Sequence, residues 1–208
     1  MPTKSPPISG AWFVLLAATL WGTTGTAQTF APVGTSPLAV GTMRMVLGGA
    51  LLAGLMFVRG GWRHNGRWPL WPLLLAVVGV VSYQLLFFAG VARTGVAVGT
   101  IVGIGSSPIM AGFLTWLVWR KRPGRQWALA TGLAIVGCAL LIGGGQAIQV
   151  DVGGMLLAVG AGAAYAVYTI ASKFLVGERP STVVAGVVFG LGALLLLPRC
   201  FVLDLGWF

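Results

Sequence analysis

Seven long apolar stretches alternate with short polar connections along the chain. Each stretch is close to the roughly 20 residues that a helix needs to cross about 30 Å of hydrocarbon. The pattern therefore predicts an all-α membrane protein, a polytopic bundle of seven transmembrane helices. Because the connections are short, sequential helices are expected to be antiparallel neighbours. The predicted spans are residues 11–30, 37–58, 70–92, 95–119, 127–144, 154–175 and 182–197.

The composition supports a membrane location and excludes one class of partner. Hydrophobic residues make up 57% of the 208 residues and charged residues 8%, and the mean hydropathy is +0.94. This is more apolar side chain than a globular core of this length can bury. Lys and Arg number 13 against 3 acidic residues. They form short clusters between apolar spans rather than a basic helix face, so we expect no nucleic-acid partner.

The distribution of positive charge predicts the orientation in the membrane. Cytoplasmic connections retain Lys and Arg, and the basic residues fall before the first span and in alternate connections. Residues 1–10 are therefore expected to form a cytoplasmic N-terminal tail of a multi-pass membrane protein. Tryptophans near the same helix ends are typical of headgroup anchors. The basic residues concerned are Lys4, Arg59, Arg63, Arg67, Arg120, Lys121, Arg122, Arg125, Lys173 and Arg179.

The second span carries one charged residue, Arg44. A guanidinium keeps its proton in a protein, and its insertion at the centre of a membrane helix costs roughly 2.5 to 3.5 kcal/mol or more. We expect Arg44 to face the bundle interior, a watery cavity or a partner's polar groups, or to snorkel towards the headgroups. It either holds an anionic group of a substrate or stabilises the structure, and the structural role is favoured.

Several polar-tipped side chains lie well inside the other spans. Such tips need hydrogen-bond partners in hydrocarbon, so we expect them to point inward and to meet at one cavity near the midplane. Each residue alone is also explained by an interhelical packing contact. Their origin in different helices favours a shared cavity. The candidates for the substrate cavity are Trp21, Arg44, Tyr83, Gln84, Ser107, Tyr165 and Tyr168.

Small residues recur every fourth position in the fourth span. Gly95, Gly99, Gly103 and Ala111 belong to this stripe, which lets helix backbones approach closely. We expect the stripe to pack within the molecule rather than to form a dimer face. Pro108, in the middle of the span, removes a backbone hydrogen bond and predicts a kink.

The start of the chain resembles its sixth span when shifted by 144 positions. Trp21 then coincides with Tyr165, and Val40 with Val184. Five helices separate the two copies. An odd number inverts the second copy relative to the first, which is the plan of many secondary transporters with a substrate site between the repeats. The expected parts are a first five-helix repeat, residues 11–145, and an inverted second repeat with two of its five helices, residues 146–208.

Together these features resemble the EamA domain of the drug/metabolite transporter superfamily. The resemblance implies an inner-membrane carrier of two five-helix inverted repeats that moves amino acids, other metabolites or drugs by alternating access. Seven spans would complete that plan by dimerisation or through a missing three-helix segment. The resemblance rests on Trp21-Gly22, on Ser36-Pro37-Leu38 before Arg44, on residues 97–108 with Trp116, on the basic turn 120–122, and on residues 132–144 and 154–173.

The function implied by this resemblance is transport of a small organic solute, with the substrate and the lipid bilayer as partners. The alternative is a truncated, non-transporting membrane fragment or an interaction subunit of a larger assembly. An enzyme is not expected, because the sequence has no His cluster, paired carboxylates or nucleophile with a base. The three acids, Asp151, Glu178 and Asp204, lie outside the spans. We therefore expect no buried carboxylate to carry protons, and no cofactor or metal.

Overall fold

The computed structural model describes residues 35–61, 66–120, 124–143, 151–177 and 179–202, together with residues 10, 12, 15–20, 23 and 30. The chain divides into two compact units, Met1–Thr35 and Ser36–Phe208. In the first unit, residues 15–20 are helical and belong to the first predicted span. Trp21 lies outside the described residues. The arrangement reported below is that of the second unit.

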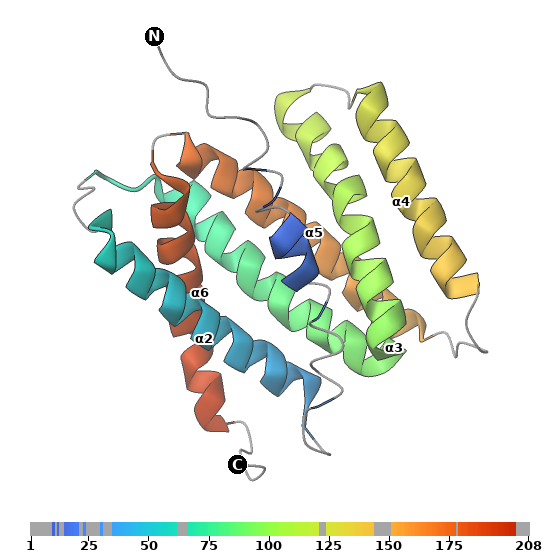
Figure 1. Ribbon diagram of the computed structural model, residues 1–208, viewed down its shortest axis with the longest axis horizontal. Helices are drawn as coiled ribbons and strands as arrows, with labels where there is room; N and C mark the ends of the chain where they lie inside the picture. Colours follow the sequence, from blue (N-terminus) through green and yellow to red (C-terminus); the bar gives the residue numbers. More distant parts are fainter. Residues whose placement is uncertain are drawn as a thin grey trace. The chain divides into compact units, whose positions relative to one another are not determined.

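Five helices make up the described part of the second unit (Figure 1). They are α2, Pro37–Val58; α3, Leu70–Trp119; α4, Arg125–Gly143; α5, Val152–Val176; and α6, Ser181–Val202. Among the described residues, α2, α3, α5 and the Ser181–Pro198 part of α6 are long and apolar enough to cross a membrane. The prediction of an all-α membrane fold is confirmed. The seven-span count and the inverted repeat stay predictions.

Helix α3 consists of two arms that join at Gly95. Its 50 residues would make a straight helix of about 75 Å, more than twice the thickness of the hydrocarbon. Gly95 interrupts the helix with φ 81° and ψ 162°, a conformation that is essentially open to glycine alone. The first arm, residues 70–94, and the second arm, residues 96–119, correspond to the third and fourth predicted spans. Figure 1 shows the chain reversing direction between them.

The helix ends have local causes in the sequence. Pro37 occupies the first turn of α2, where its missing N–H is not needed for a helical hydrogen bond. Asp151 caps α5, and its Oδ1 accepts a hydrogen bond of 2.9 Å from the N–H of Gly153. Helix α3 ends at Trp119, and its C-cap residue Arg120 has a φ of 56°, in the left-handed region. These ends keep the connections short, but the closest packing is between helices that are not successive, α3 with α5 and α2 with α6. The expectation that sequential helices are the main neighbours is therefore wrong for this unit.

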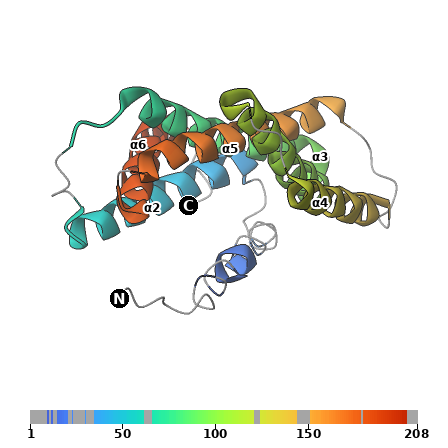
Figure 2. The ribbon, with the colours of Figure 1, turned by 90° about the horizontal axis from the view of Figure 1, so that it is seen from above.

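Two antiparallel helix pairs pack most closely in this unit, the first arm of α3 with α5 and α2 with α6 (Figures 1 and 2). Glycines bring the backbones of the first pair together. A Cβ built on Gly79 would lie 2.8 Å from the backbone N of Tyr168, and one on Gly90 would lie 3.1 Å from the backbone N of Ala158. Close backbone approach is how membrane helices associate where lipid removes the hydrophobic driving force.

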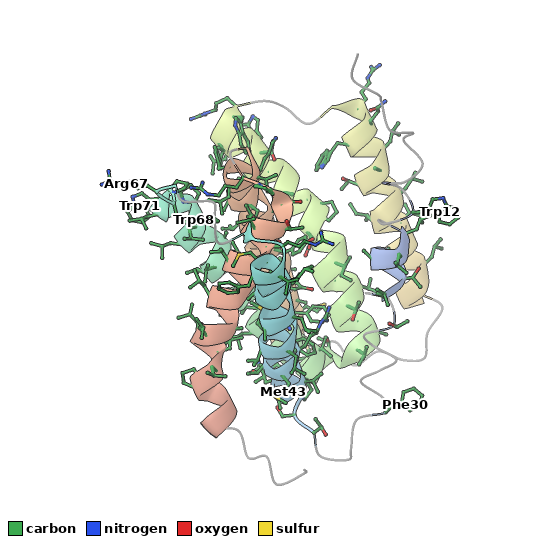
Figure 3. All side chains as sticks on the ribbon, turned by 60° about the vertical axis from the view of Figure 1, so that its left-hand side comes forward. Trp12, Phe30, Met43, Arg67, Trp68 and Trp71 are labelled. Carbon is green, nitrogen blue, oxygen red and sulfur yellow. The ribbon has the colours of Figure 1, made fainter. Side chains whose placement is uncertain are left out.

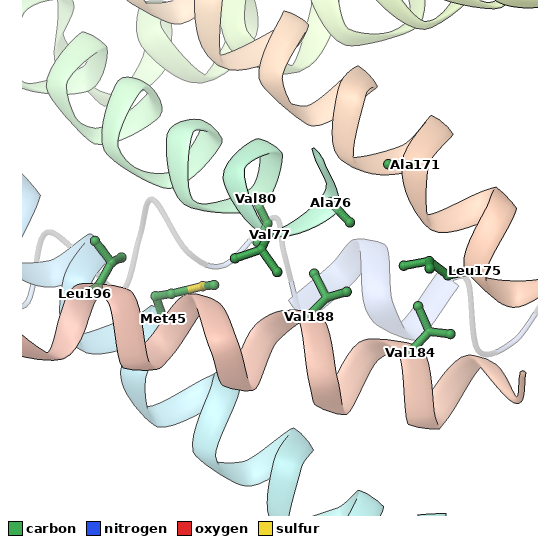
Figure 4. Packing of buried hydrophobic residues seen from close by; sticks show 9 residues of the cluster. All are labelled: Met45, Ala76, Val77, Val80, Ala171, Leu175, Val184, Val188 and Leu196. Carbon is green, nitrogen blue, oxygen red and sulfur yellow. The ribbon is translucent and has the colours of Figure 1, made fainter. Parts of the chain in front are cut away.

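The core lies where these two pairs meet (Figure 4). Its residues come from α2, the first arm of α3, α5 and α6, so it ties both pairs into one bundle. Phe88, Leu175 and Val188 are among the largest fully buried side chains. The cluster comprises Met45, Ala76, Val77, Val80, Ala171, Leu175, Val184, Val188 and Leu196.

Arg179 connects two loops at one end of the bundle. It lies in the turn between α5 and α6 and is buried. Its Nη2 donates a hydrogen bond of 3.1 Å to the carbonyl oxygen of Arg67, and its guanidinium carbon lies 4.3 Å from the ring centroid of Trp68. Figure 3 labels Arg67, Trp68 and Trp71 at this end. A residue expected only to mark the cytoplasmic side therefore also holds the connection before α3 in place.

We expect Arg179→Gln to lower the unfolding midpoint of the purified protein in detergent. The variant loses a charge-assisted hydrogen bond and a cation–π contact, together worth about 2 kcal/mol. Thermal unfolding followed by circular dichroism measures the change. Arg125→Gln is the control, because Arg125 is exposed at the start of α4. Equal midpoints for the two variants would contradict a structural role for Arg179.

Candidate functional site

Six aromatic rings form a continuous row through the bundle, which we call the aromatic row. It joins the first arm of α3 to α5 and α6. The ring centroids of Tyr83 and Tyr165 are 5.3 Å apart, those of Tyr165 and Tyr168 5.8 Å, and those of Tyr168 and Phe189 5.7 Å. Phe87 and Phe88 extend the row on α3, with centroid distances of 5.7 Å from Tyr83 to Phe87 and 5.3 Å from Phe87 to Phe88.

Helical spacing explains how the aromatic row is assembled. Tyr83 and Phe87 are four residues apart on α3, and Tyr165 and Tyr168 are three apart on α5, so each pair shares one helix face. Antiparallel packing of the two helices then brings the faces together. Tyr83 is 8% exposed, whereas Tyr165 and Tyr168 are only partly buried. Three of the predicted cavity residues thus lie in contact, and the tyrosines of α5 are partly exposed.

Gln84 is next to Tyr83 in the sequence, but its side chain contacts α2 rather than the aromatic row. It is 6% exposed, and its Nε2 donates a hydrogen bond of 2.9 Å to the carbonyl oxygen of Gly41 in α2. The ring of Phe88 packs on the same glycine. A buried amide needs such a partner. The side chain therefore ties α3 to α2, and its predicted contact with a substrate stays a prediction.

Ser107 and the small-residue stripe lie where the second arm of α3 meets α5. The hydroxyl of Ser107 donates to the carbonyl oxygen of Gly103 at 2.8 Å, one turn back on its own helix. A Cβ built on Gly103 would lie 3.3 Å from Cδ2 of Phe87 in the first arm and 3.5 Å from the carbonyl oxygen of Ala158 in α5, and one on Gly99 would lie 2.8 Å from Cγ2 of Val91 in the first arm. Gly99 and Gly103 thus occupy close interhelical contacts.

Three other predicted residues lie apart from the aromatic row. Arg44 is exposed on α2, whereas the next residue, Met45, is in the core at 3% exposure, so the guanidinium points away from the core of this unit. Gly95 is exposed at the bend of α3, and a Cβ built there would meet no atom within 4 Å. Ala111 is partly buried on the second arm.

Comparison with known proteins decides the family. Residues 8–143 match the model of the EamA-like transporter family. The chain belongs to this family. Membership and the apolar helices together make it a multi-pass membrane protein. The predicted resemblance is therefore confirmed.

Two relatives of this EamA-like chain are named as transporters. It is 46% identical over 196 residues to the uncharacterized transporter YwfM of Bacillus subtilis, which covers 94% of this chain and 66% of the relative. It is 26% identical over 193 residues to the uncharacterized inner membrane transporter YicL of Salmonella typhimurium, which covers 89% of this chain and 64% of the relative. The chain thus spans slightly less than two thirds of either relative. No solved structure matches it.

The EamA-like chain also has an apolar groove of about 410 Å³ between α2 and α6, which the sequence analysis did not anticipate. Its floor is made of small residues, among them Gly49 and Ala53 of α2 and Gly186 and Gly190 of α6. A Cβ built on Gly190 would lie 3.3 Å from the Cβ of Ala53. The sequence feature that could have predicted the groove is the set of small residues in both helices. Hydropathy alone does not distinguish these positions from the rest of the two spans.

Proposed function

We propose that this EamA-like chain is an inner-membrane secondary transporter of small organic solutes that works by alternating access, with its N-terminus in the cytoplasm. The observation that carries the proposal is the aromatic row, in which Tyr83, Tyr165 and Tyr168 meet across two helices. Family membership supports transport as the activity. Amino acids, other metabolites and drugs are the proposed substrate class.

The aromatic row has the chemistry that a small amphipathic solute requires. Ring faces give large apolar contact area with few rotatable bonds, and phenol hydroxyls orient polar groups of a ligand. The accessible parts of Tyr165 and Tyr168 are the proposed contacts. Tyr83 is more deeply buried and supports the ring of Tyr165 from the first arm of α3.

The packing of α2 against α6 supports the inverted-repeat plan on which alternating access depends. The 144-residue shift seen in the sequence relates Gly49 to Ala193 and Ala53 to Leu197. A Cβ built on Gly49 would lie 2.7 Å from the Cβ of Ala193, its shifted equivalent. All four of these residues line the groove between the two antiparallel helices. Contact between equivalent residues is expected beside a two-fold pseudo-symmetry axis, and transporters place the substrate site between repeats.

Coupling to an ion through a buried acid is not part of the proposal. Asp151 caps α5 at the end of the bundle. Among the residues that the structure describes, no group of three or more His, Cys, Asp or Glu side chains is placed to hold a metal ion. We propose that substrate binding itself, rather than a carboxylate within these described helices, drives the change between states.

The test is solute flux into liposomes that contain the purified protein, screened with a panel of amino acids and cationic, neutral and anionic drugs. For any transported solute, Tyr165→Ala is expected to lower flux about fivefold or more, because a lost aromatic contact is worth roughly 1 kcal/mol or more. Tyr165→Phe keeps the ring and should retain most of the flux for solutes held by stacking. Phe113→Ala is the control, since Phe113 is exposed on the second arm of α3.

Two results would contradict the proposal. Absence of flux for every solute, with the protein folded by circular dichroism, would leave the chain without the proposed activity. Flux that falls equally in Tyr165→Ala and Phe113→Ala would remove the aromatic row from the mechanism while leaving transport itself in place.

A further inference from the structure

The second arm of α3 lacks one helical hydrogen bond in its middle, at Pro108. This residue has no N–H for the carbonyl oxygen of Ile104. The hydroxyls of Ser106 and Ser107 both donate to the carbonyl oxygen of Gly103, at 3.2 and 2.8 Å. Serine hydroxyls that bond back along a helix favour bending, and proline is a common site of kinks. The arm can therefore bend here with little loss of hydrogen bonding.

The half of the arm before Pro108 is held tightly on two sides. A Cβ built on Gly162 of α5 would lie 3.0 Å from the carbonyl oxygen of Gly103 and 3.1 Å from the backbone N of Ser107. A Cβ built on Gly99 would lie 2.9 Å from Cα of Val91 in the first arm. Because backbone atoms make these contacts, this half of the arm is fixed against α5 and against the first arm.

Residues 108–119, which we call the distal segment, meet α5 through large side chains at their end. The rings of Trp119 and Phe174 stack, with centroids 5.4 Å apart and an interplanar angle of 14°. Nζ of Lys173 lies 5.0 Å from the centroid of the Trp119 ring. Phe174 is 47% exposed and Lys173 is exposed as well. We call these three side chains the Trp119 contact.

The tight contact and the Trp119 contact belong to one pair of parallel helices. Ser107 and Gly162 are 55 positions apart in the sequence, and so are Trp119 and Phe174. At Gly162 the two backbones touch, whereas at Trp119 two rings span the distance between them. Figure 1 shows α5 and the second arm diverging in that direction. The Trp119 contact can therefore separate without breaking any backbone hydrogen bond.

Helix α4 is attached to the distal segment. Gly112 of this segment is buried, and a Cβ built on it would lie 2.7 Å from Cε2 of Trp127 in α4. Among the helices that the structure describes, α3 is the main neighbour of α4, and Figures 1 and 2 show α4 beside the second arm. A movement of the distal segment would therefore carry α4 with it.

We propose that the distal segment and α4 move together about Ser106–Pro108, and that the Trp119 contact holds their closed position. The contact lies six residues beyond Tyr168 on α5, about 9 Å from the aromatic row. A bend of about 20° at Pro108 would move the end of the distal segment by about 6 Å. The proposal rests on the proposed function for the purpose of this movement, which is to admit a solute to the aromatic row from the cytoplasmic end.

The experiment is pulsed electron paramagnetic resonance on the full chain in liposomes, with two spin-labelled cysteines. The labels replace Val118 and Val176, which are exposed near the ends of the second arm and of α5. The native Cys138 and Cys200 are changed to alanine. The closed position should give the main distance between the labels, and the open position a minor distance about 6 Å longer.

The variants act on the Trp119 contact one side chain at a time. Trp119→Ala removes both the stacked ring and the cation–π contact, and should raise the ratio of long to short distances about tenfold. Lys173→Gln removes only the cation and should raise it about threefold. Trp116→Ala is the matched control, because Trp116 lies on the same segment and contacts Phe113 of its own helix, with ring centroids 6.1 Å apart. It should leave the ratio unchanged.

Two further measurements locate the bend. Pro108→Ala restores the missing hydrogen bond and should lower the ratio of long to short distances. A second pair of labels replaces Ile104, on the fixed half of the arm, and Leu156 of α5, which are 41% and 68% exposed. This pair should keep one distance in every variant.

Three results would overturn the proposal: a single distance between the labels at residues 118 and 176 in every variant, equal ratios in Trp119→Ala and Trp116→Ala, or a movement of the second pair. The distances are read without a solute, so they fail or hold separately from transport. A folded protein with the expected distances and no flux would contradict the proposed function alone. Flux with distances that ignore Trp119→Ala would contradict the bend at Pro108 alone.

Discussion

Gly162→Val is expected to destabilise the bundle by about 3 kcal/mol or more, at the upper end of overpacking effects. Gly162 lies in α5 against the second arm of α3. A Cβ built there would lie 3.0 Å from the carbonyl oxygen of Gly103 and 3.1 Å from the backbone N of Ser107, and closer still to the hydroxyl oxygen of Ser106. Two of these three atoms belong to the backbone, so no side-chain rotation relieves the clash. The helices would have to separate.

The measurement is unfolding of the purified protein in mixed micelles, together with the yield of monodisperse protein from the membrane. Gly160→Val is the matched control, two residues away on the same helix. A Cβ at Gly160 would meet its nearest atom, Cδ1 of Leu86, at 3.5 Å, which is an ordinary contact. We expect the control to unfold close to the unmodified protein. A Gly162 variant as stable as the Gly160 variant would contradict the close contact between α3 and α5.

Hydropathy and the positions of prolines predicted the helices of this unit well. The second predicted span, residues 37–58, has the bounds observed for α2, because Pro37 fixes its start and the Arg59-Gly60 turn its end. The break between the third and fourth spans was also expected from length, since no single helix of 50 residues fits the hydrocarbon. Helix length and apolar content are local properties, and the sequence carries them directly.

The hydrogen-bond and ring-packing partners of the polar residues could not be predicted from the sequence. Gln84, Ser107 and Tyr83 have similar positions within apolar spans. In the structure Gln84 bonds the carbonyl oxygen of Gly41 on another helix, and Ser107 bonds one turn back on its own helix. Tyr83 packs its ring on Tyr165. These outcomes depend on which helix faces which. Each backbone carbonyl oxygen can accept a hydrogen bond, so the sequence does not show which one a given side chain will reach.

For the stripe of small residues too, the sequence predicted a local property but not the partner in the folded structure. The spacing predicted that Gly99 and Gly103 would lie at close contacts, but one helix cannot reveal its partner. The partner includes Gly162, which the sequence analysis did not single out and which sits in a helix with several other glycines and alanines. Likewise the groove between α2 and α6 results from missing side chains, so no apolar pattern marks it.

Gly95→Val is the second substitution with a large expected effect, because it acts on the reversal of α3. A β-branched residue is strongly disfavoured at the φ of 81° and ψ of 162° that Gly95 adopts. The strain is worth about 3 kcal/mol at the upper end for one such position. A steric clash with other residues does not contribute, since a Cβ at Gly95 would meet nothing within 4 Å. The loss would therefore be purely conformational.

The Gly95→Val variant cannot relieve this strain by adopting a helical conformation at residue 95. If residue 95 took a helical conformation, the two arms of α3 would join into one rod of about 75 Å, which the bilayer cannot accommodate. It would also separate Gly99 from Val91, whose Cγ2 lies 2.8 Å from a Cβ built on that glycine. Unfolding in mixed micelles should thus give a lower midpoint for Gly95→Val than for Gly132→Val. Gly132 is the matched control, because it is exposed on α4 and also has no atom within 4 Å of a built Cβ. Equal midpoints would mean that residue 95 can leave its left-handed conformation at little cost, and that the reversal of α3 is not fixed at this glycine.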